Sequence, residues 1–226
     1  MSTRVPAGLQ DAFDRERRGA RAARADEPQA LAQTVRMFGR LAALQAGVIA
    51  ERRIDVACAR GCSYCCHLRV EIRPHEAFVL ARHIESRFDA TRRALIVARC
   101  EATLRRISPL SPPQHVRAGV PCALLEDGAC SAYEGRPAAC RKYYSLSVDT
   151  CRNAFHDTQA PLTGALEDEE VRLAGNALAL GYAMGLADAG YDTALYELHF
   201  ALHKALTDPR AARRYRQRKR AFVADD

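Results

Sequence analysis

Eight of the nine cysteines of this chain fall into two groups whose spacing could hold a metal. The first group spans nine residues and comprises Cys58, Cys62, Cys65 and Cys66. The second group has intervals of eight, ten and eleven residues and comprises Cys122, Cys130, Cys140 and Cys151. Packing does not require four thiols so close together, whereas soft thiolates suit zinc and iron–sulfur sites. All eight are therefore candidate metal ligands.

The spacing within the first group limits how its thiols can share an ion. Cys58, Cys62 and Cys65 can surround one centre, because two or three intervening residues let the backbone fold back on itself. Adjacent side chains diverge, so Cys65 and Cys66 are not expected to bind the same tetrahedral ion. Two neighbouring centres and one polynuclear centre both stay open, with the second group supplying one to four of the ligands.

The alternative is a set of buried structural thiols, and we assign Cys100 to that class because it lies apart from both groups. For the eight clustered cysteines we favour a metal. A structural zinc supplies about 10–16 kcal/mol of folding free energy, comparable to the net stability of a whole domain. That energy could by itself hold the irregular stretch 54–73 in shape.

The identity of the metal is open between zinc and iron. Zinc fingers usually contain two Cys-x2-Cys or Cys-x2-His knuckles, and only Cys62 to Cys65 has that form. The lack of histidine among the evident ligands favours an iron–sulfur cluster. Histidines near the groups are interpreted as surface or supporting residues: His67, His75 and His156. His199 and His203 are four residues apart on a predicted helix and could bind a metal as a pair, but with no third ligand evident we favour packing.

The order of residues in both groups resembles the CxxxCxxCC family of YkgJ-type cysteine-cluster proteins, which are zinc- or iron-chelating domains. The residues that carry the resemblance are Cys58-x3-Cys62-x2-Cys65-Cys66 and then Pro121-Cys122-x-Leu124-Leu125-x-x-Gly128-x-Cys130-x-x-Tyr133-x-x-Arg136-Pro137-x-x-Cys140-Arg141. It covers about residues 55–155. The resemblance implies one metal centre built from all eight cysteines, with no defined biochemical role. Flagellin lysine methylases are distantly similar in this pattern, which leaves an enzymatic role open.

An iron–sulfur oxidoreductase or a S-adenosylmethionine-dependent enzyme is therefore the alternative function. Cys58-x3-Cys62-x-Tyr64-Cys65 also fits the radical S-adenosylmethionine signature. That fold requires alternating strands and helices and a later glycine-rich stretch, and the sequence shows neither. No nucleophile–base pair stands out, so catalytic residues stay unassigned. Arg136 is expected to contact a thiolate or a nearby carbonyl.

Composition indicates a globular protein in the cytoplasm. The chain has 226 residues, 48% of them hydrophobic and 27% charged, without an N-terminal apolar run or a membrane-spanning stretch. A reducing cytoplasm keeps thiols free for metal. Eight thiolates would turn the formal charge of +7 into −1, so the charge is weak evidence for a nucleic-acid partner. A nucleic-acid binder acting through the basic C-terminal tail is the third and less favoured function, because attraction of such a tail to phosphate is generic. No protein partner is indicated. Arginines near the groups are expected to offset thiolate charge: Arg60, Arg69, Arg136 and Arg141.

Helical patterns flank the cysteines, so the fold class is mainly α, with helices packed around a cysteine-rich loop and hairpin. Residues 1–26 are a charged N-terminal arm, in which 8–26 form either a helix or a loosely held segment. Residues 27–207 are a single globular domain, and 208–226 are a basic C-terminal helix or tail. Helices are expected over about 29–52, from Pro74, from Asp89, over 171–189, and through the leucines at 195, 198, 202 and 206. Gly175, Gly181 and Gly185 are expected to allow close helix packing.

Shorter elements are expected to carry the cysteines themselves. Residues 58–66 are predicted to form a loop, and 68–72 alternate as a short strand. The Asp127-Gly128 pair predicts a hairpin turn between Cys122 and Cys130. Residues 108–113 are a proline-rich connector. Arg136-Pro137 starts a helical turn that presents Cys140.

Overall fold

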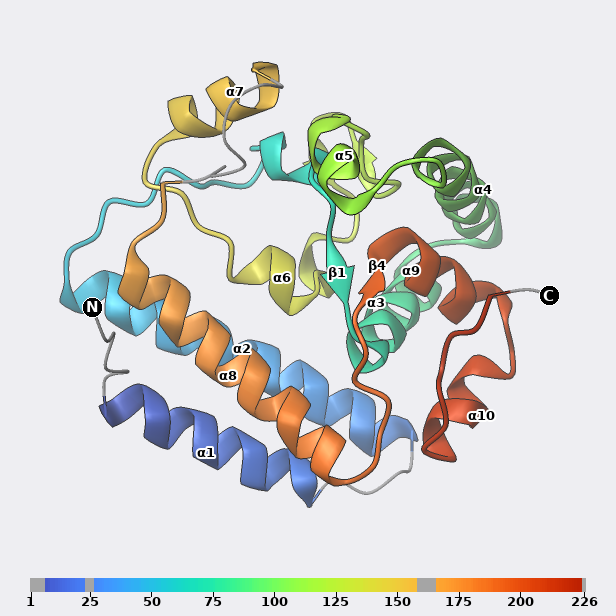
Figure 1. Ribbon diagram of the computed structural model, residues 1–226, viewed down its shortest axis with the longest axis horizontal. Helices are drawn as coiled ribbons and strands as arrows, with labels where there is room; N and C mark the ends of the chain where they lie inside the picture. The colour runs from blue at the N-terminus through green and yellow to red at the C-terminus, as the bar shows by residue number, and fades with distance from the viewer. Residues whose placement is uncertain (1–6, 23–26, 158–165, 225–226) are drawn as a thin grey trace.

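The computed structural model describes residues 7–22, 27–157 and 166–224, and it is mainly helical, as the sequence predicts. Three long helices lie side by side on one side of the molecule (Figure 1). They are α1 (Ala7–Arg21), α2 (Glu27–Glu51) and α8 (Glu169–Asp188). The helices expected over 29–52 and 171–189 are thus confirmed. The boundaries proposed at residues 26 and 207 stay predictions.

Helices α1 and α8 approach closely because α8 carries glycine where they cross. A Cβ on Gly181 would lie 2.5 Å from the carbonyl oxygen of Phe13, and one on Gly185 would meet the backbone of Arg17. Arg17 also donates from Nε to Asp188 at 2.7 Å. The helical alternative for the N-terminal stretch is confirmed, and the expectation that these glycines allow close packing is confirmed as well.

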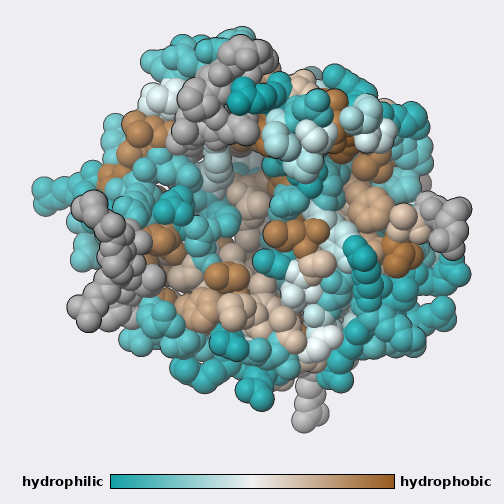
Figure 2. Space-filling view, viewed as in Figure 1, coloured by the Kyte–Doolittle hydropathy of each residue, from teal (hydrophilic) through white to brown (hydrophobic). Residues whose placement is uncertain are grey.

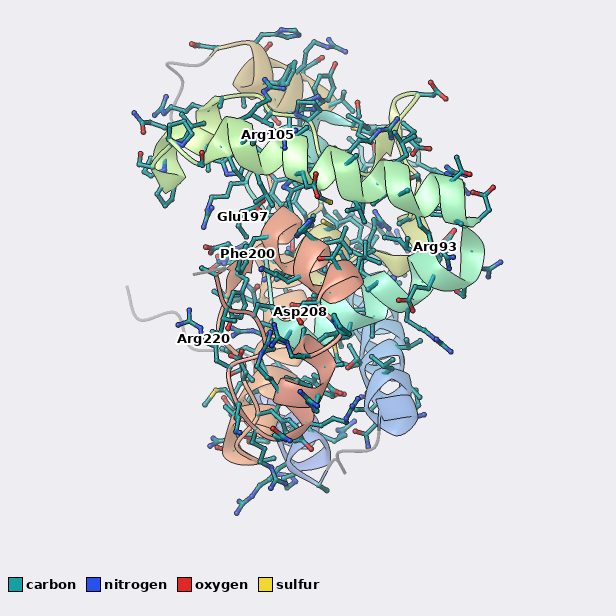
Figure 3. All side chains as sticks on the ribbon, turned by 90° about the vertical axis from the view of Figure 1, so that its right-hand side faces the viewer. Arg93, Arg105, Glu197, Phe200, Asp208 and Arg220 are labelled. Carbon is teal, nitrogen blue, oxygen red and sulfur yellow. The ribbon has the colours of Figure 1, made fainter. Side chains whose placement is uncertain are left out.

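A second group of helices packs around the other core of the molecule, on the right of Figure 1 and facing the viewer in Figure 3. It contains α3 (Pro74–Arg87), α4 (Ala90–Ile107) and α9 (Leu198–Thr207). α10 (Ala211–Arg216) lies on the same side, but Ala211 and Tyr215 pack into the core that includes residues of α2 and α8. Asp89 caps α4 by accepting a hydrogen bond from the Arg92 N–H at 2.8 Å, as its residue type predicts. Cys100 has no exposed surface and belongs to this core. Its assignment as a packing residue is confirmed.

Short elements and the loops between them complete the fold. The short elements are η1 (Tyr64–His67), β1 (Glu71–Ile72), α5 (Pro112–Arg117), β2 (Leu125–Glu126), β3 (Ala129–Cys130), η2 (Tyr133–Gly135), α6 (Ala138–Arg141), α7 (Val148–His156) and β4 (Tyr196–Glu197). Among them, η1, β3, α6 and α7 carry five of the clustered cysteines. β2 and β3 form the predicted hairpin, whose turn residues Asp127 and Gly128 have φ values of 47° and 75°.

Three local predictions need correction. The strand expected over 68–72 is reduced to β1, because its pairing is with the two residues of β4, Tyr196 and Glu197. The same pairing explains why α9 begins only at Leu198 and leaves Leu195 exposed outside it. The connector predicted over 108–113 ends in helix α5, because Ser111 forms a capping box with Gln114.

Hydrophobic residues on the face shown in Figure 2 gather towards the middle, and hydrophilic residues surround them. No helix within the described ranges is long and apolar enough to cross a membrane. The same view places α6, β1 and β4 near the centre of the molecule (Figure 1). α6, which carries Cys140, therefore lies between the two helical groups, whereas α7, which carries Cys151, lies at the top edge of this view.

Candidate metal centre

Six of the eight clustered cysteines line one cavity of about 240 Å³. These six are Cys62, Cys65, Cys66, Cys122, Cys130 and Cys140. They come from the loop and short helix around η1, from the β2–β3 hairpin region and from α6. The two cysteine groups, which are more than 50 residues apart in sequence, therefore meet at one place in the molecule.

Backbone hydrogen bonds join the two groups directly. The Cys122 N–H donates to the carbonyl oxygen of Cys66 at 2.8 Å, and the Leu125 N–H donates to the carbonyl oxygen of Cys122 at 2.9 Å. Ser131 closes the hairpin by donating its N–H to the carbonyl oxygen of Leu124 at 2.8 Å. The position of Cys122 relative to Cys66 is thus set by the main chain.

Cys140 reaches the cavity because α6 is tied to α3. The buried carboxylate of Glu76 accepts a hydrogen bond from the Ala138 N–H and another from the Arg73 N–H, both at 2.8 Å. These N–H groups begin α6 and α3, where a carboxylate replaces the missing backbone acceptors. Burial raises the pKa of Glu76, and the two hydrogen bonds oppose that shift.

Cys58 and Cys151 lie beside the cavity and do not line it. The Ser145 N–H donates to Sγ of Cys58 at 3.1 Å, and the buried Ser145 hydroxyl contacts Ser147 at the start of α7. α7, which carries Cys151, packs on η1 through Phe155. Its ring lies 4.7 Å from the His67 ring and 5.9 Å from the Tyr64 ring. Ser145 therefore brings the Cys58 loop and the Cys151 helix together.

Burial and neighbouring thiols oppose ionisation of four clustered cysteines, namely Cys58, Cys66, Cys130 and Cys140. Burial raises the pKa of Cys130 to about 11, with Cys122 adding to the shift and Arg136 partly opposing it. Burial likewise raises the pKa of Cys140. A hydrogen bond between Cys65 and Cys66 lowers the pKa of Cys65 to about 7 and raises that of Cys66. A bound cation would reverse this balance, because it stabilises thiolates directly.

The donor set fits zinc or iron, because it consists of soft sulfur atoms at a partly buried cavity. Within the described residues, no group of three or more His, Cys, Asp or Glu side chains is already spaced to hold an ion. Binding would thus draw the thiols closer together than they lie here. All nine cysteines are free, so none is tied up in a disulfide.

The comparison with known families agrees with this geometry. A family model named CxxCxxCC, described as a "putative zinc- or iron-chelating domain", matches residues 57–161. Residues 57–161 are thus similar to a CxxCxxCC domain. The resemblance seen in the sequence is thereby confirmed. No match is found among curated proteins or among solved structures.

The CxxCxxCC domain does not build the cavity alone. Leu198 and His199, which begin α9, also line it, and both lie outside residues 57–161. His203, one turn further along α9, instead pairs with the exposed Glu101 at 3.2 Å. The histidine pair considered from the sequence therefore separates into one residue at the cavity and one outside it. Nothing in the sequence spacing distinguishes the two.

The other histidines near the CxxCxxCC cysteines have structural contacts. His67 packs on Phe155, and its Nδ1 lies 3.1 Å from the carbonyl oxygen of Ser63. His156 packs against the same phenylalanine at 5.1 Å. His75 is only 5% exposed and meets the ring of Tyr182 at 5.3 Å, so its expected surface position is wrong. It is buried because it lies in the first turn of α3, facing α8.

The four arginines expected to offset thiolate charge differ in how close they lie to the cysteine cavity. The Arg136 guanidinium lies 3.4 Å from the centroid of the Tyr133 ring, donates to the Tyr133 carbonyl at 2.9 Å and lines the cavity. Arg69 also lines it but pairs with Glu71 at 2.7 Å. Arg141 donates to the carbonyl oxygen of Arg136, and Arg60 lies over the Tyr133 ring. Arg136 is therefore the arginine best placed to offset thiolate charge.

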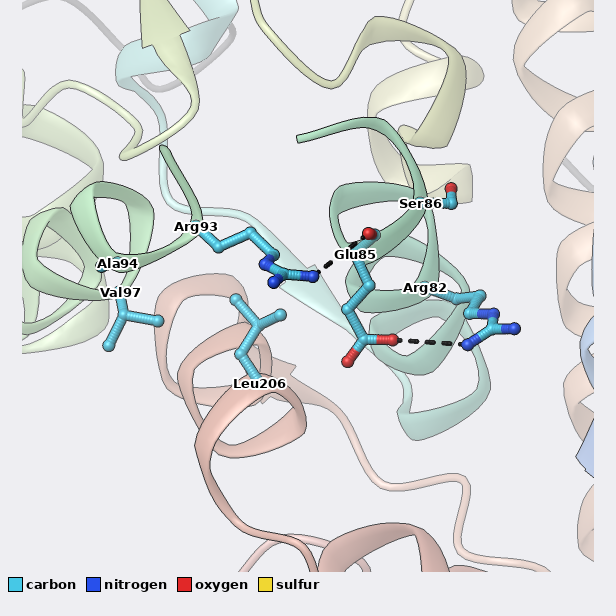
Figure 4. Close-up of a pocket in the computed structure, with 7 residues that line it drawn as sticks. All are labelled: Arg82, Glu85, Ser86, Arg93, Ala94, Val97 and Leu206. Atoms are coloured by element: carbon cyan, nitrogen blue, oxygen red, sulfur yellow. Dashed lines mark hydrogen bonds and ion pairs between the residues drawn. The ribbon is translucent and has the colours of Figure 1, made fainter. Parts of the chain in front are cut away.

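A second hollow of about 560 Å³ lies between α3, α4 and α9 (Figure 4). Arg93 donates there to the carbonyl oxygen of Glu85 at 3.3 Å, and Arg82 lies 3.8 Å from the Glu85 carboxylate. No cysteine or histidine lines this hollow. The chemistry-bearing residues are therefore concentrated in the cysteine cavity.

Proposed function

We propose that this protein is a cytoplasmic metal-binding protein that holds zinc or iron at the cysteine cavity. The observation that supports it is the convergence of six thiols on one cavity within a zinc- or iron-chelating domain. The proposed ligands are Cys58, Cys62, Cys65, Cys66, Cys122, Cys130, Cys140 and Cys151. The cytoplasm is proposed because nine free cysteines suit a reducing compartment.

The arrangement of the thiols suggests how the eight cysteines could be shared between metal centres. Zinc takes four ligands in its structural sites, so eight thiolates exceed what one ion needs. The six cysteines of the cavity supply an inner set, and Cys58 and Cys151 are adjacent to it. Two four-thiolate centres, either zinc ions or iron–sulfur clusters, would use all eight, because each cluster also takes four cysteines. The metal is a partner in either case, while no membrane or nucleic acid is required.

An iron–sulfur oxidoreductase or S-adenosylmethionine-dependent enzyme related to flagellin lysine methylases is the second candidate. It is favoured by the apolar wall of the same cavity, to which Leu68, Val70 and Leu198 contribute. An ion bound only by thiolates does not need such a wall, whereas an organic ligand beside a cluster would use it.

Metal content and absorption of protein purified without oxygen would test both candidates. Stoichiometric zinc in a colourless protein would support a structural or chelating role. Iron with acid-labile sulfide and visible absorption would support the redox candidate. A properly folded protein that binds neither metal would contradict the proposal.

Two serine substitutions separate metal binding from packing. Cys140→Ser at the cavity should lower metal occupancy to less than half, because one buried donor is lost. Cys100→Ser is the matched control, since Cys100 is fully buried in the core and does not line the cavity. It should lower the melting temperature and leave the metal content per folded chain unchanged. Equal metal content in both variants would exclude Cys140 as a ligand.

A further inference from the structure

His199 lines the cysteine cavity from outside the CxxCxxCC domain and belongs to neither cysteine group. It is the second residue of α9 and only 5% exposed. A buried imidazole beside six thiols could bind the metal or could hold a ligand in place. Its hydrogen bonds distinguish these roles.

The Glu197 carboxylate orients the imidazole. Nδ1 of His199 lies 2.7 Å from Oε1 of Glu197, whose other carboxylate oxygen accepts the Phe200 N–H at 3.0 Å. Figure 3 labels Glu197 and Phe200 at the start of α9. Glu197 is itself fixed because it pairs with Glu71 of β1 across the short sheet. A carboxylate accepts hydrogen bonds, so Nδ1 carries the proton and Nε2 is left as an acceptor.

Nε2 of His199 is hydrogen-bonded to the backbone next to Cys122. It accepts a hydrogen bond from the Ala123 N–H at 3.1 Å. The preceding N–H, of Cys122, donates to the carbonyl oxygen of Cys66. Two successive N–H groups therefore fix the backbone of Cys122, one to the first cysteine group and one to α9.

We propose that His199 is a positioning residue of the metal centre, which fixes the Cys122–Ala123 backbone and so directs the Cys122 thiol into the cavity. This inference rests on the proposed metal-binding function. A ligand role for Nε2 would take its lone pair from the Ala123 N–H. Ala123 is only 4% exposed, and a buried N–H without an acceptor is strongly unfavourable.

Two substitutions of His199 discriminate between positioning and ligation. Glutamine can place an amide oxygen near the position of Nε2 and so accept the Ala123 N–H, whereas the shorter asparagine reaches only the position of Nδ1. His199→Asn should therefore weaken Zn²⁺ binding by about 10–100-fold, the usual effect of losing a group that orients a ligand. His199→Gln should stay within a few-fold of the wild type. His203→Asn on the same helix is the matched control and should have no effect.

Cobalt substitution gives the readout that a purely structural role would not predict. If His199 positions Cys122 and does not bind the metal, the thiolate-to-Co²⁺ absorption bands of His199→Gln should keep their wild-type positions. A shift of the bands in His199→Gln, together with weaker binding, would mean that a nitrogen ligand had been lost. That result would overturn the proposal, as would equal Zn²⁺ affinity in His199→Asn and the wild type.

Amide exchange of Ala123 in the metal-free chain tests the contact independently of any metal. The Ala123 N–H should be protected from exchange in the wild type, in His203→Asn and in His199→Gln. In His199→Asn it should exchange at least about tenfold faster, because an amide is protected only while its hydrogen bond is formed. Rapid exchange of Ala123 in the wild type would overturn the inference without any variant. A failure of every variant and the wild type to bind metal would instead contradict the proposed function.

Discussion

At the residue scale, the polar side chains inside this protein include some whose hydrogen bonds are satisfied and some whose are not. Glu76, which is buried, and Glu197, which is half-buried, accept backbone hydrogen bonds at helix starts, and both are linked to residues of the cysteine cavity. His75 differs, because its side chain is buried and its Nδ1 has no hydrogen-bond partner among the residues that the structure describes. Burial lowers the pKa of His75 to about 3, and the positive charge of Arg73 adds to the shift.

This shift makes the stability of the protein depend on pH. Between pH values of about 3 and about 6.5, the unfolded chain binds a proton at His75 and the folded chain does not. The free energy of unfolding should therefore decrease as the pH falls through this window, by about 2 kcal/mol at pH 5 relative to pH 7. Urea unfolding of the metal-free chain at both pH values measures it.

The variant His75→Phe provides the control for the His75 prediction. It keeps a ring against Tyr182 and leaves Arg73 and Glu76 in place, but it has no proton to bind. Its loss of stability between pH 7 and pH 5 should be smaller than that of the wild type by about the same 2 kcal/mol. Parallel pH profiles for the two proteins would show that His75 does not cause the dependence.

At the element scale, close contacts between helices decide where the long elements lie. α1 packs on α8 over Gly181 and Gly185, and the ion pair between Arg17 and Asp188 joins the ends of the contact. Tyr182 of α8 hydrogen-bonds Thr34 of α2 at 3.1 Å. The three helices thus form one packed unit next to the cysteine-bearing elements.

Gly181→Ala should loosen α1. The new Cβ would lie 2.5 Å from the carbonyl oxygen of Phe13, a backbone atom that cannot rotate away. We expect a loss of about 1–3 kcal/mol of unfolding free energy, typical of overpacking, with faster amide exchange along α1. Gly39→Ala in α2 is the matched control, because no atom of a neighbouring residue lies within 4 Å of the place that its methyl group would take. It should be neutral or stabilise the helix by up to about 1 kcal/mol. A Gly181→Ala protein as stable as Gly39→Ala would contradict the packing described.

At the scale of the whole molecule, the cysteine cavity joins segments from distant parts of the chain. Its walls come from the 61–71 region, the 122–143 region and the start of α9. A metal held there would cross-link these segments, and its binding free energy would become folding free energy. The α1–α2–α8 unit does not contribute to the cavity.

Removal of the metal should therefore destabilise the segments that line the cavity more than the rest of the protein. Chelation of the metal from the native protein is expected to lower its melting temperature and to speed amide exchange in residues 57–70 and 121–143. Exchange in α2 and α8 should change less than about threefold, because neither helix lines the cavity and most of their packing is with each other and with α1. Re-adding Zn²⁺ to a zinc-containing preparation should restore protection. Uniform loss of protection throughout the chain would show that the metal supports the whole fold.

Much of the local structure could be predicted because its causes are local. The repeat of apolar residues predicts α2, Asp89 caps α4, and Asp127-Gly128 makes the hairpin turn. The cysteine spacing identified the domain, and its metal chemistry follows from the residue types themselves. The small size of β1, by contrast, depended on a partner strand more than 120 residues away.

The sequence by itself determined which residues could hold a metal and that helices would surround them. Only the tertiary structure decided that six of the eight cysteines line the cavity while Cys58 and Cys151 lie beside it. It also decided that His199 faces the cavity and His203 does not. The reason is physical: capping, turns and helical periodicity act over a few residues, whereas proximity across the chain depends on how whole helices pack.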